Sequence, residues 1–188
     1  MRRKGLILGP VIPILAAIVG TIAAAMDLRS RRIPNWLTVP AAAAGILTNT
    51  LIYSWHGLGG WHGLAQSGKG ILLGIVLLLP FVLLNSLGMG DLKLGIALGA
   101  ILGPSDLISV LILQVILAGI IALVVIVRSG RFRQTIRNIG HILGSLLALR
   151  MPGPAVSLDN PQASKIPFGV AMGLATVIFC AHQLAGKI

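Results

Sequence analysis

The chain contains no glutamate and only four aspartates among its 188 residues: Asp27, Asp91, Asp106 and Asp159. Charged residues of both signs amount to 10%, whereas 56% of the residues are hydrophobic. A soluble domain carries about 25% charged residues, so this composition argues against a soluble protein. It predicts a polytopic membrane protein.

The chain also has few residues that bind metals or form disulfides. Its single cysteine, Cys180, excludes an intrachain disulfide and a zinc site built from paired cysteines. The segment "WHGLGGWHGL" contains two histidines, but His56 and His62 are six residues apart and do not share a helix face. No third ligand is near, so we predict no metal and no cofactor. We interpret Trp55 and Trp61 as anchors at the membrane interface.

Positive charge, in contrast, is abundant, with 15 Lys and Arg residues and a net charge of +11. The basic residues fall between apolar runs, and aromatic residues make up only 4% of the chain. This distribution fits orientation in a membrane better than nucleic-acid binding. If the N-terminus is outside, ten of the fifteen basic residues lie inside, which favours that orientation, although the basic N-terminus favours the opposite one.

Six apolar runs are candidates for membrane-spanning helices, which need about 20 residues each. They cover residues 5–26, 36–54, 70–87, 92–104, 107–127 and 166–186, and the fourth run is short. The first run resembles a secretory signal, but its 22 residues exceed the about 7–15 of a signal's apolar region, so we predict a retained helix. We therefore predict an all-α membrane protein of about six transmembrane helices, with a single domain over residues 1–188.

The one long polar segment, residues 128–165, lies before the last apolar run and is predicted to be cytoplasmic. Its apolar residues recur at helical spacing, which is typical of an amphipathic helix in the membrane interface. These residues are Phe132, Ile136, Ile139, Leu143 and Leu146. A proline-rich connection follows, and its length suggests control of access to a site.

Two of the rare acids are predicted to lie on the same membrane face. Asp27 ends the first run and Asp91 opens the fourth, so two intervening spans return the chain to the face that it left. In "GMGD", Gly88 and Gly90 permit close backbone approach immediately before the next helix. Taken singly, Asp27 could merely offset a neighbouring arginine, and Asp91 could be a simple helix N-cap.

Glycines spaced four residues apart follow Asp91. Such a stripe lets another helix approach at backbone distance, either for packing within a bundle or between subunits, or for a role in a site. The stripe comprises Gly95, Gly99 and Gly103, and the pairs Gly70/Gly74 and Gly169/Gly173 repeat its spacing.

Two facing carboxylates have a specific chemistry. Held close together, they cannot both ionise cheaply and tend to share one proton. The ionised carboxylate can take a proton from water while the protonated one donates to a carbonyl or a leaving amine. This is aspartic peptide hydrolysis. We interpret the other two acids structurally, Asp106 as a helix N-cap and Asp159 as a turn residue.

The segments around both acids resemble motifs of the type IV prepilin peptidases, which are membrane aspartyl proteases of the G-x-G-D class. Asp27 followed by "RRIPN" is similar to the first catalytic motif of that family, and "GMGDLKLGIALGA" is similar to the second. "KIPFGVAMGLA" is similar to the late segment before the last helix. Besides the two acids, the motif residues are Pro34, Asn35, Gly88, Gly90, Lys93, Pro167 and Gly169.

The resemblance implies that Asp27 and Asp91 are the catalytic pair, at the cytoplasmic face of the inner membrane, and that no cofactor is needed. It implies a prepilin leader peptide as the substrate, the lipid bilayer as the surroundings and the pilus assembly machinery as a partner, with no nucleic acid. Lys93 would bias the charge of the pair or anchor its helix at lipid headgroups. The chain lacks the paired-cysteine domain of the long bifunctional members. It is similar to the short peptidase-only forms that serve Flp-type (tight adherence) pili, or to archaeal preflagellin peptidases.

Two other functions stay open. The chain could be a non-enzymatic pilus or secretion assembly subunit of the same fold, or a small proton-coupled transporter that uses the acids as proton sites. Transport sites usually lie near the membrane midplane, whereas both acids here lie near the ends of spans. A presenilin-type protease shares the G-x-G-D chemistry but lacks the "IPN" and "IPFG" matches.

Overall fold

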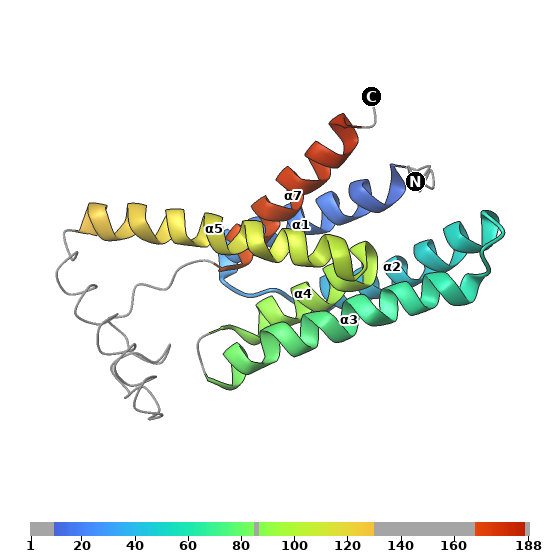
Figure 1. Cartoon of the computed structure of the whole chain (residues 1–188). Helices are drawn as coiled ribbons and strands as arrows, with labels where there is room; N and C mark the ends of the chain where they lie inside the picture. Colours follow the sequence, from blue (N-terminus) through green and yellow to red (C-terminus); the bar gives the residue numbers. More distant parts are fainter. Residues whose placement is uncertain (1–9, 85–86, 130–167, 187–188) are drawn as a thin grey trace, which may run out of the picture.

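The computed structural model describes residues 10–84, 87–129 and 168–186, which form six helices and no strand (Figure 1). The helices are α1 (Val11–Ser30), α2 (Asn35–Trp55), α3 (Gly60–Leu83), α4 (Met89–Leu102), α5 (Pro104–Ser129) and α7 (Phe168–Ala185). The prediction of an all-α membrane protein is confirmed. The predicted interfacial helix, the proline-rich connection, Asp159 and Pro167 lie outside the described residues.

Five of the six described helices are long and apolar enough to cross a membrane, and the chain is an integral membrane protein. The other helix, α4, has 14 residues and is therefore about 21 Å long, against about 30 Å for the hydrocarbon core. The remaining helices enclose it, since the side chains of Leu94, Leu98 and Ile101 are almost completely buried. The fourth apolar run thus forms a short central helix.

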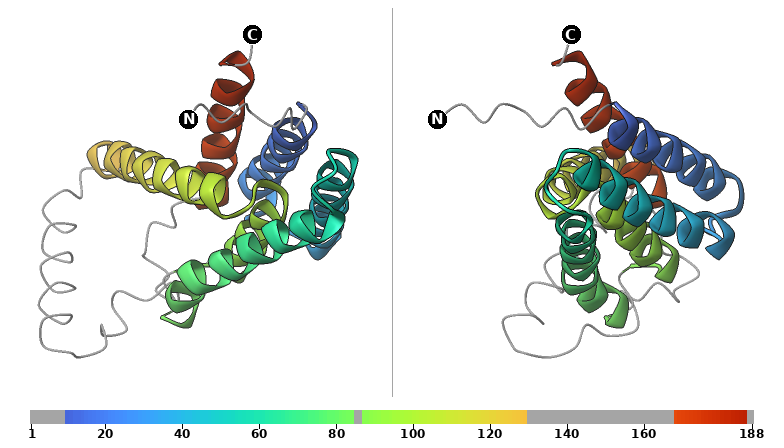
Figure 2. Two further views of the ribbon diagram at one scale, coloured as in Figure 1. Left: turned by 45° about the vertical axis from the view of Figure 1, so that its right-hand side comes forward. Right: turned by 90° about the vertical axis from the view of Figure 1, so that its right-hand side faces the viewer.

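The helices pack in two groups (Figures 1 and 2). One group consists of α2, α3 and α4, which all pack on one another. In the other group, α1 and α5 both pack on α7. The groups meet mainly where α1 contacts α2 and α4, and where α5 contacts α3 and α4. We call this boundary between α2–α3–α4 and α1–α5–α7 the seam.

Glycines account for the closest helix contacts. A Cβ atom at Gly70 of α3 would overlap the backbone carbonyl of Gly99 in α4, and one at Gly74 would lie 3.1 Å from the carbonyl oxygen of Gly95. At Gly173, α7 meets the backbone of α1 in the same way. Of the roles considered for the glycine spacing, the structure shows packing within the bundle at these positions.

A buried polar cluster fixes α2, α3 and α4 together. The side-chain nitrogen of Asn49 lies 2.9 Å from the hydroxyl oxygen of Ser67 and 3.0 Å from the carbonyl oxygens of Ala100 and Ile101. The Ser67 hydroxyl also donates to the Ala100 carbonyl at 2.8 Å. Buried polar groups of this kind hold membrane helices in one arrangement. The cluster therefore fixes the C-terminal end of α4 against α2 and α3.

Candidate active site

Asp27 lies in the last turn of α1, and only 8% of its surface is exposed. Its Oδ2 atom accepts a hydrogen bond of 3.1 Å from the backbone N–H of Val170, in the first turn of α7. The first N–H groups of a helix have no intrahelical partner and suit a carboxylate. Among the described residues Asp27 forms no ion pair with an arginine, so the structure does not support the reading that it offsets one.

Gly169 makes this contact possible. A Cβ atom at position 169 would lie 2.8 Å from Cγ and 2.9 Å from Oδ2 of Asp27, closer than carbon atoms pack. Only glycine lets α7 begin directly against the carboxyl group. Gly169, selected from the "IPFG" segment, is therefore a neighbour of Asp27 in space, although 142 residues separate the two in the sequence.

The connection from α1 to α2 forms one wall of the site. Arg31 ends α1 in a left-handed conformation with φ 51°, and its N–H donates to the Asp27 carbonyl at 2.9 Å. Ile33 is buried after this turn, and Pro34 stands in extended conformation immediately before α2. A Cβ atom at Gly90 would lie 3.3 Å from Cβ of Ile33, so the second glycine of "GMGD" lets the start of α4 contact this connection.

Asp91 is the third residue of α4, and Gly88 is the N-cap residue. Asp91 is therefore not itself the cap, and it lies outside the five helices that are long enough to cross a membrane. Two effects raise the pKa of Asp91 from its ordinary 3.8 to about 7: burial, which is the larger effect, and the negative charge of Asp27. A hydrogen bond from the backbone of Gly88 acts in the opposite direction and lowers the pKa. The two acids thus interact electrostatically across the seam.

Lys93 connects α4 to the start of α2. Its Nζ atom donates a hydrogen bond of 2.9 Å to Oδ1 of Asn35, the first residue of α2. Of the two roles considered for Lys93, the structure shows neither directly. It shows instead that the lysine connects the two segments that carry the first and second motifs.

The structure thus places the predicted site residues at four helix ends. Asp27 ends α1, Pro34 and Asn35 begin α2, the "GMGD" segment and Lys93 begin α4, and Gly169 begins α7. These ends meet through the contacts Asp27–Val170, Gly90–Ile33 and Lys93–Asn35. The site therefore lies on the seam, with one acid from each helix group.

Three other predicted residues lie apart from the site. Asp106 is the third residue of α5 rather than its N-cap, so that interpretation is wrong. Its Oδ2 atom accepts a hydrogen bond of 2.9 Å from the Gln183 side chain. His56 and His62 are exposed, and the described residues include no group of three or more His, Cys, Asp or Glu side chains arranged to hold a metal ion.

The sequence profile of the type IV leader peptidase family matches residues 14–123. The chain belongs to the type IV leader peptidase family. The matched region runs from α1 into α5 and contains both Asp27 and Asp91. No curated protein and no solved structure gives a significant match. Membership in this family indicates a membrane-embedded protease with a leader-peptidase type of activity.

The family match ends before α7, so the place of α7 in the site rests on the structure and on the resemblance of the "KIPFGVAMGLA" segment. Val170 could not be identified from the sequence, because its contribution is a backbone N–H that any residue except proline could supply. Ile33 is a second residue of the site that is not among the motif residues named above. An apolar residue directly after the charged "RSRR" segment is the only signal that could have indicated a buried position there.

Proposed function

We propose that this leader peptidase is an aspartic endopeptidase that removes the leader peptide of type IV prepilin-like substrates. Asp27 and Asp91 would together activate the attacking water. The observation that carries the proposal is that the helix ends bearing the two acids meet, through the contacts Asp27–Val170 and Gly90–Ile33. Burial, and then the charge of Asp27, raise the pKa of Asp91 to about 7, which supports the proposal. Two carboxyl groups that share one proton show such coupling, and the pKa near neutrality suits a group that must give and take a proton.

In the proposed reaction, Asp91 is the general acid and Asp27 is the general base. Asp27 takes a proton from water, the water oxygen attacks the scissile carbonyl carbon, and Asp91 donates its proton to the carbonyl oxygen. The tetrahedral intermediate then breaks its C–N bond, Asp27 returns its proton to the leaving amine, and the hydroxyl proton of the collapsing intermediate returns to Asp91. The reaction consumes one water molecule and restores both acids.

The neighbouring residues position the two acids. The Val170 N–H holds one oxygen of Asp27, which leaves the other oxygen for water. Gly88 is the N-cap of α4 and Gly90 lies in its first turn, and the Lys93–Asn35 bond holds the start of α4 at the start of α2. A site built at the ends of rigid helices keeps the reacting groups in place without movement at the moment of reaction.

The proposal extends to the place of the reaction in the cell. The whole chain, residues 1–188, would act as one peptidase domain in the cytoplasmic membrane, with the acids at the cytoplasmic face. The substrate would be cut on the cytoplasmic side of its apolar helix, in an Flp-type pilus or archaeal preflagellin system, and the enzyme would work beside the pilus assembly machinery. The excess of basic residues on that side supports this orientation.

The test is leader removal by purified protein in liposomes that contain a prepilin. Asp27→Asn and Asp91→Asn each remove one ionisable group while keeping the size of the side chain, and each should lower the cleavage rate at least about 100-fold. Asp106→Asn is the matched control, because Asp106 pairs with Gln183 away from the site, and it should cleave normally. Normal cleavage by either well-expressed site variant would refute the two-aspartate mechanism. If the wild-type protein cannot cleave beside an active control peptidase, the assembly-subunit alternative is favoured.

A further inference from the structure

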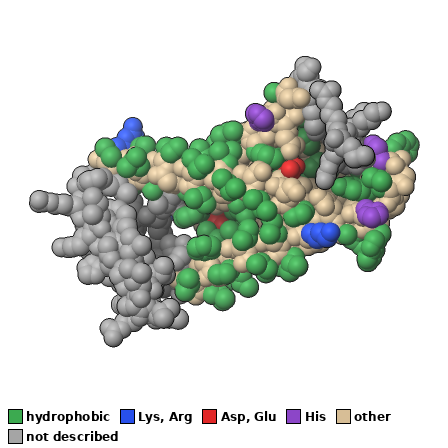
Figure 3. Space-filling view, in the orientation of Figure 1, with side chains coloured by type: hydrophobic (Ala, Val, Ile, Leu, Met, Phe, Trp, Pro, Cys, Tyr) green, Lys and Arg blue, Asp and Glu red, His purple; other side chains and the backbone are tan. Residues whose placement is uncertain are grey.

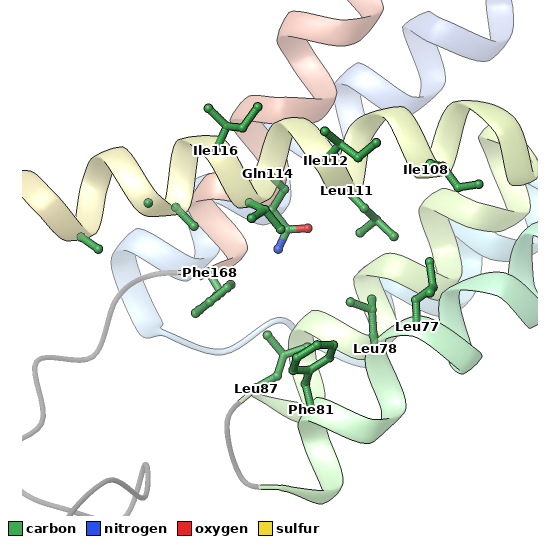
Figure 4. A pocket seen from close by; sticks show the side chains of 14 residues that line it. Leu77, Leu78, Phe81, Leu87, Ile108, Leu111, Ile112, Gln114, Ile116 and Phe168 are labelled. Carbon is green, nitrogen blue, oxygen red and sulfur yellow. The ribbon is translucent and has the colours of Figure 1, made fainter. Parts of the chain in front are cut away.

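An apolar groove of about 790 Å³ runs along the seam between α3 and α5. Its volume falls in the range of ligand pockets, about 300–1,000 Å³. Leu78 and Phe81 of α3 line one side and Leu111 and Ile112 of α5 line the other, as the close view shows (Figure 4). Hydrophobic side chains cover both helices on this face of the molecule (Figure 3).

One residue of the groove does not fit an apolar lining. Gln114 of α5 is 97% buried, and its side-chain amide forms no hydrogen bond within the residues that the structure describes. Figure 4 shows this amide pointing into the groove from α5, above Phe168. A polar amide that faces an apolar groove without a partner is unfavourable, so the groove is suited to an occupant that supplies a hydrogen bond.

The groove continues to the candidate active site. Its lining includes Leu87 and Phe168, each of which directly precedes a glycine of the site. Gly88 packs beside the Asp91 carboxyl and Gly169 packs beside the Asp27 carboxyl. An extended or helical chain that lies in the groove would therefore reach both acids at this end.

We propose that the α3–α5 groove binds the apolar helix of the peptidase substrate and that the Gln114 amide hydrogen-bonds the open backbone groups at the start of that helix. This inference rests on the proposed function. The first four N–H groups of a helix have no intrahelical partner, and in an apolar groove they need one. Cleavage next to the start of the helix would require these groups to lie close to the two acids. A lipid acyl chain could fill the groove but offers the amide no hydrogen bond.

Gly119 provides a variant that closes the groove without disturbing the fold. It lines the groove, and a Cβ atom at this position would have no atom within 4 Å. Gly119→Trp should therefore fill the groove and raise the KM for a full-length prepilin at least about tenfold. Gly68→Trp is the matched control, because Gly68 on α3 is equally open but does not line the groove. It should leave cleavage unchanged.

Gln114→Met tests the hydrogen bond, because methionine keeps the length of the side chain and removes the amide. In Gln114→Met the KM for prepilin should rise about 3- to 10-fold with kcat retained. Gln114→Asn keeps an amide on a shorter side chain, so its KM should rise less than that of Gln114→Met. If Gln114 had a purely structural role, Gln114→Met would instead lower the thermal stability of the protein and reduce kcat and kcat/KM together. Unchanged KM in both Gln114→Met and Gly119→Trp would overturn the proposal.

Photo-cross-linking separates this inference from the proposed function. A benzophenone amino acid at position 112, in an Asp27→Asn background and with the prepilin present, should label the apolar helix of the prepilin. Labelling only of lipid, or only of the peptidase itself, would overturn the proposed occupant. If the wild-type protein does not cleave prepilin but position 112 still labels its apolar helix, the proposed hydrolysis fails while the groove assignment stands.

Discussion

The contact between α7 and Asp27 provides a quantitative test through Gly169→Ala. The added methyl group would lie 2.8 Å from Cγ of Asp27, whereas carbon atoms prefer about 3.5 Å or more. Relief of this overlap requires α7 and the carboxyl group to separate by about 0.7 Å. The hydrogen bond from Val170, now 3.1 Å, would then be about 3.8 Å long and no longer a hydrogen bond.

The loss of this bond sets the size of the effect. A hydrogen bond to a charged group contributes about 1.5–3 kcal/mol, and each 1.36 kcal/mol corresponds to a factor of ten in rate. If the bond positions Asp27 for the reaction, kcat/KM for prepilin should fall about 10- to 150-fold in Gly169→Ala.

The assay is leader cleavage in liposomes, with thermal unfolding of the same preparations followed in parallel. Gly68→Ala is the control, because that glycine also lies inside a helix but its added methyl group would meet no atom within 4 Å. It should cleave within about twofold of the wild type. Cleavage at the wild-type rate by Gly169→Ala would show that the start of α7 does not position Asp27.

Three further predictions concern the proton on Asp91, the link to α2 and the polar cluster. Because Asp91 donates its proton in the proposed reaction, kcat/KM for prepilin should fall as the pH rises through its pKa of about 7, and a constant rate across neutral pH would contradict the role of Asp91. Lys93→Met and Asn35→Ala should each weaken cleavage, and their effects should not add, with a coupling of about 1 kcal/mol in a double-mutant cycle. Asn49→Ala should lower the free energy of unfolding in detergent by about 2 kcal/mol, and Thr50→Ala, which breaks only a bond within α2, should have a smaller effect.

Most helices of this protein could be predicted from the sequence, because the length of an apolar run directly reflects the thickness of the bilayer. The bounds of the run 70–87 were wrong, because α3, Gly60–Leu83, begins ten residues earlier. The run 36–54 corresponds to α2, residues Asn35–Trp55, and the run 166–186 corresponds to α7, residues Phe168–Ala185. The two acids with their motif residues could be selected as well, because carboxylates are rare here and stand beside unusual glycine and proline patterns.

The partners of these residues could not be predicted. The spacing of Gly95 and Gly99 indicates a close helix contact, but only the structure identifies α3 as the partner of α4. Gln114 and Asn49 are polar residues inside apolar runs, so each had to have some polar partner or function. The sequence does not reveal that Asn49 pairs within the bundle while Gln114 points into a groove. This difference depends on how the two helix groups meet.

Carboxyl ¹³C NMR provides the most direct test of the central claim, that Asp27 and Asp91 interact across the seam. The chain has no glutamate, so labelled aspartate gives only four side-chain carboxyl signals. We expect the Asp91 signal to titrate near pH 7 in the wild type and at a lower pH in Asp27→Asn, because the variant removes the negative charge that raises the Asp91 pKa. An Asp91 signal that titrates near 3.8, or that does not move in Asp27→Asn, would contradict the shared site.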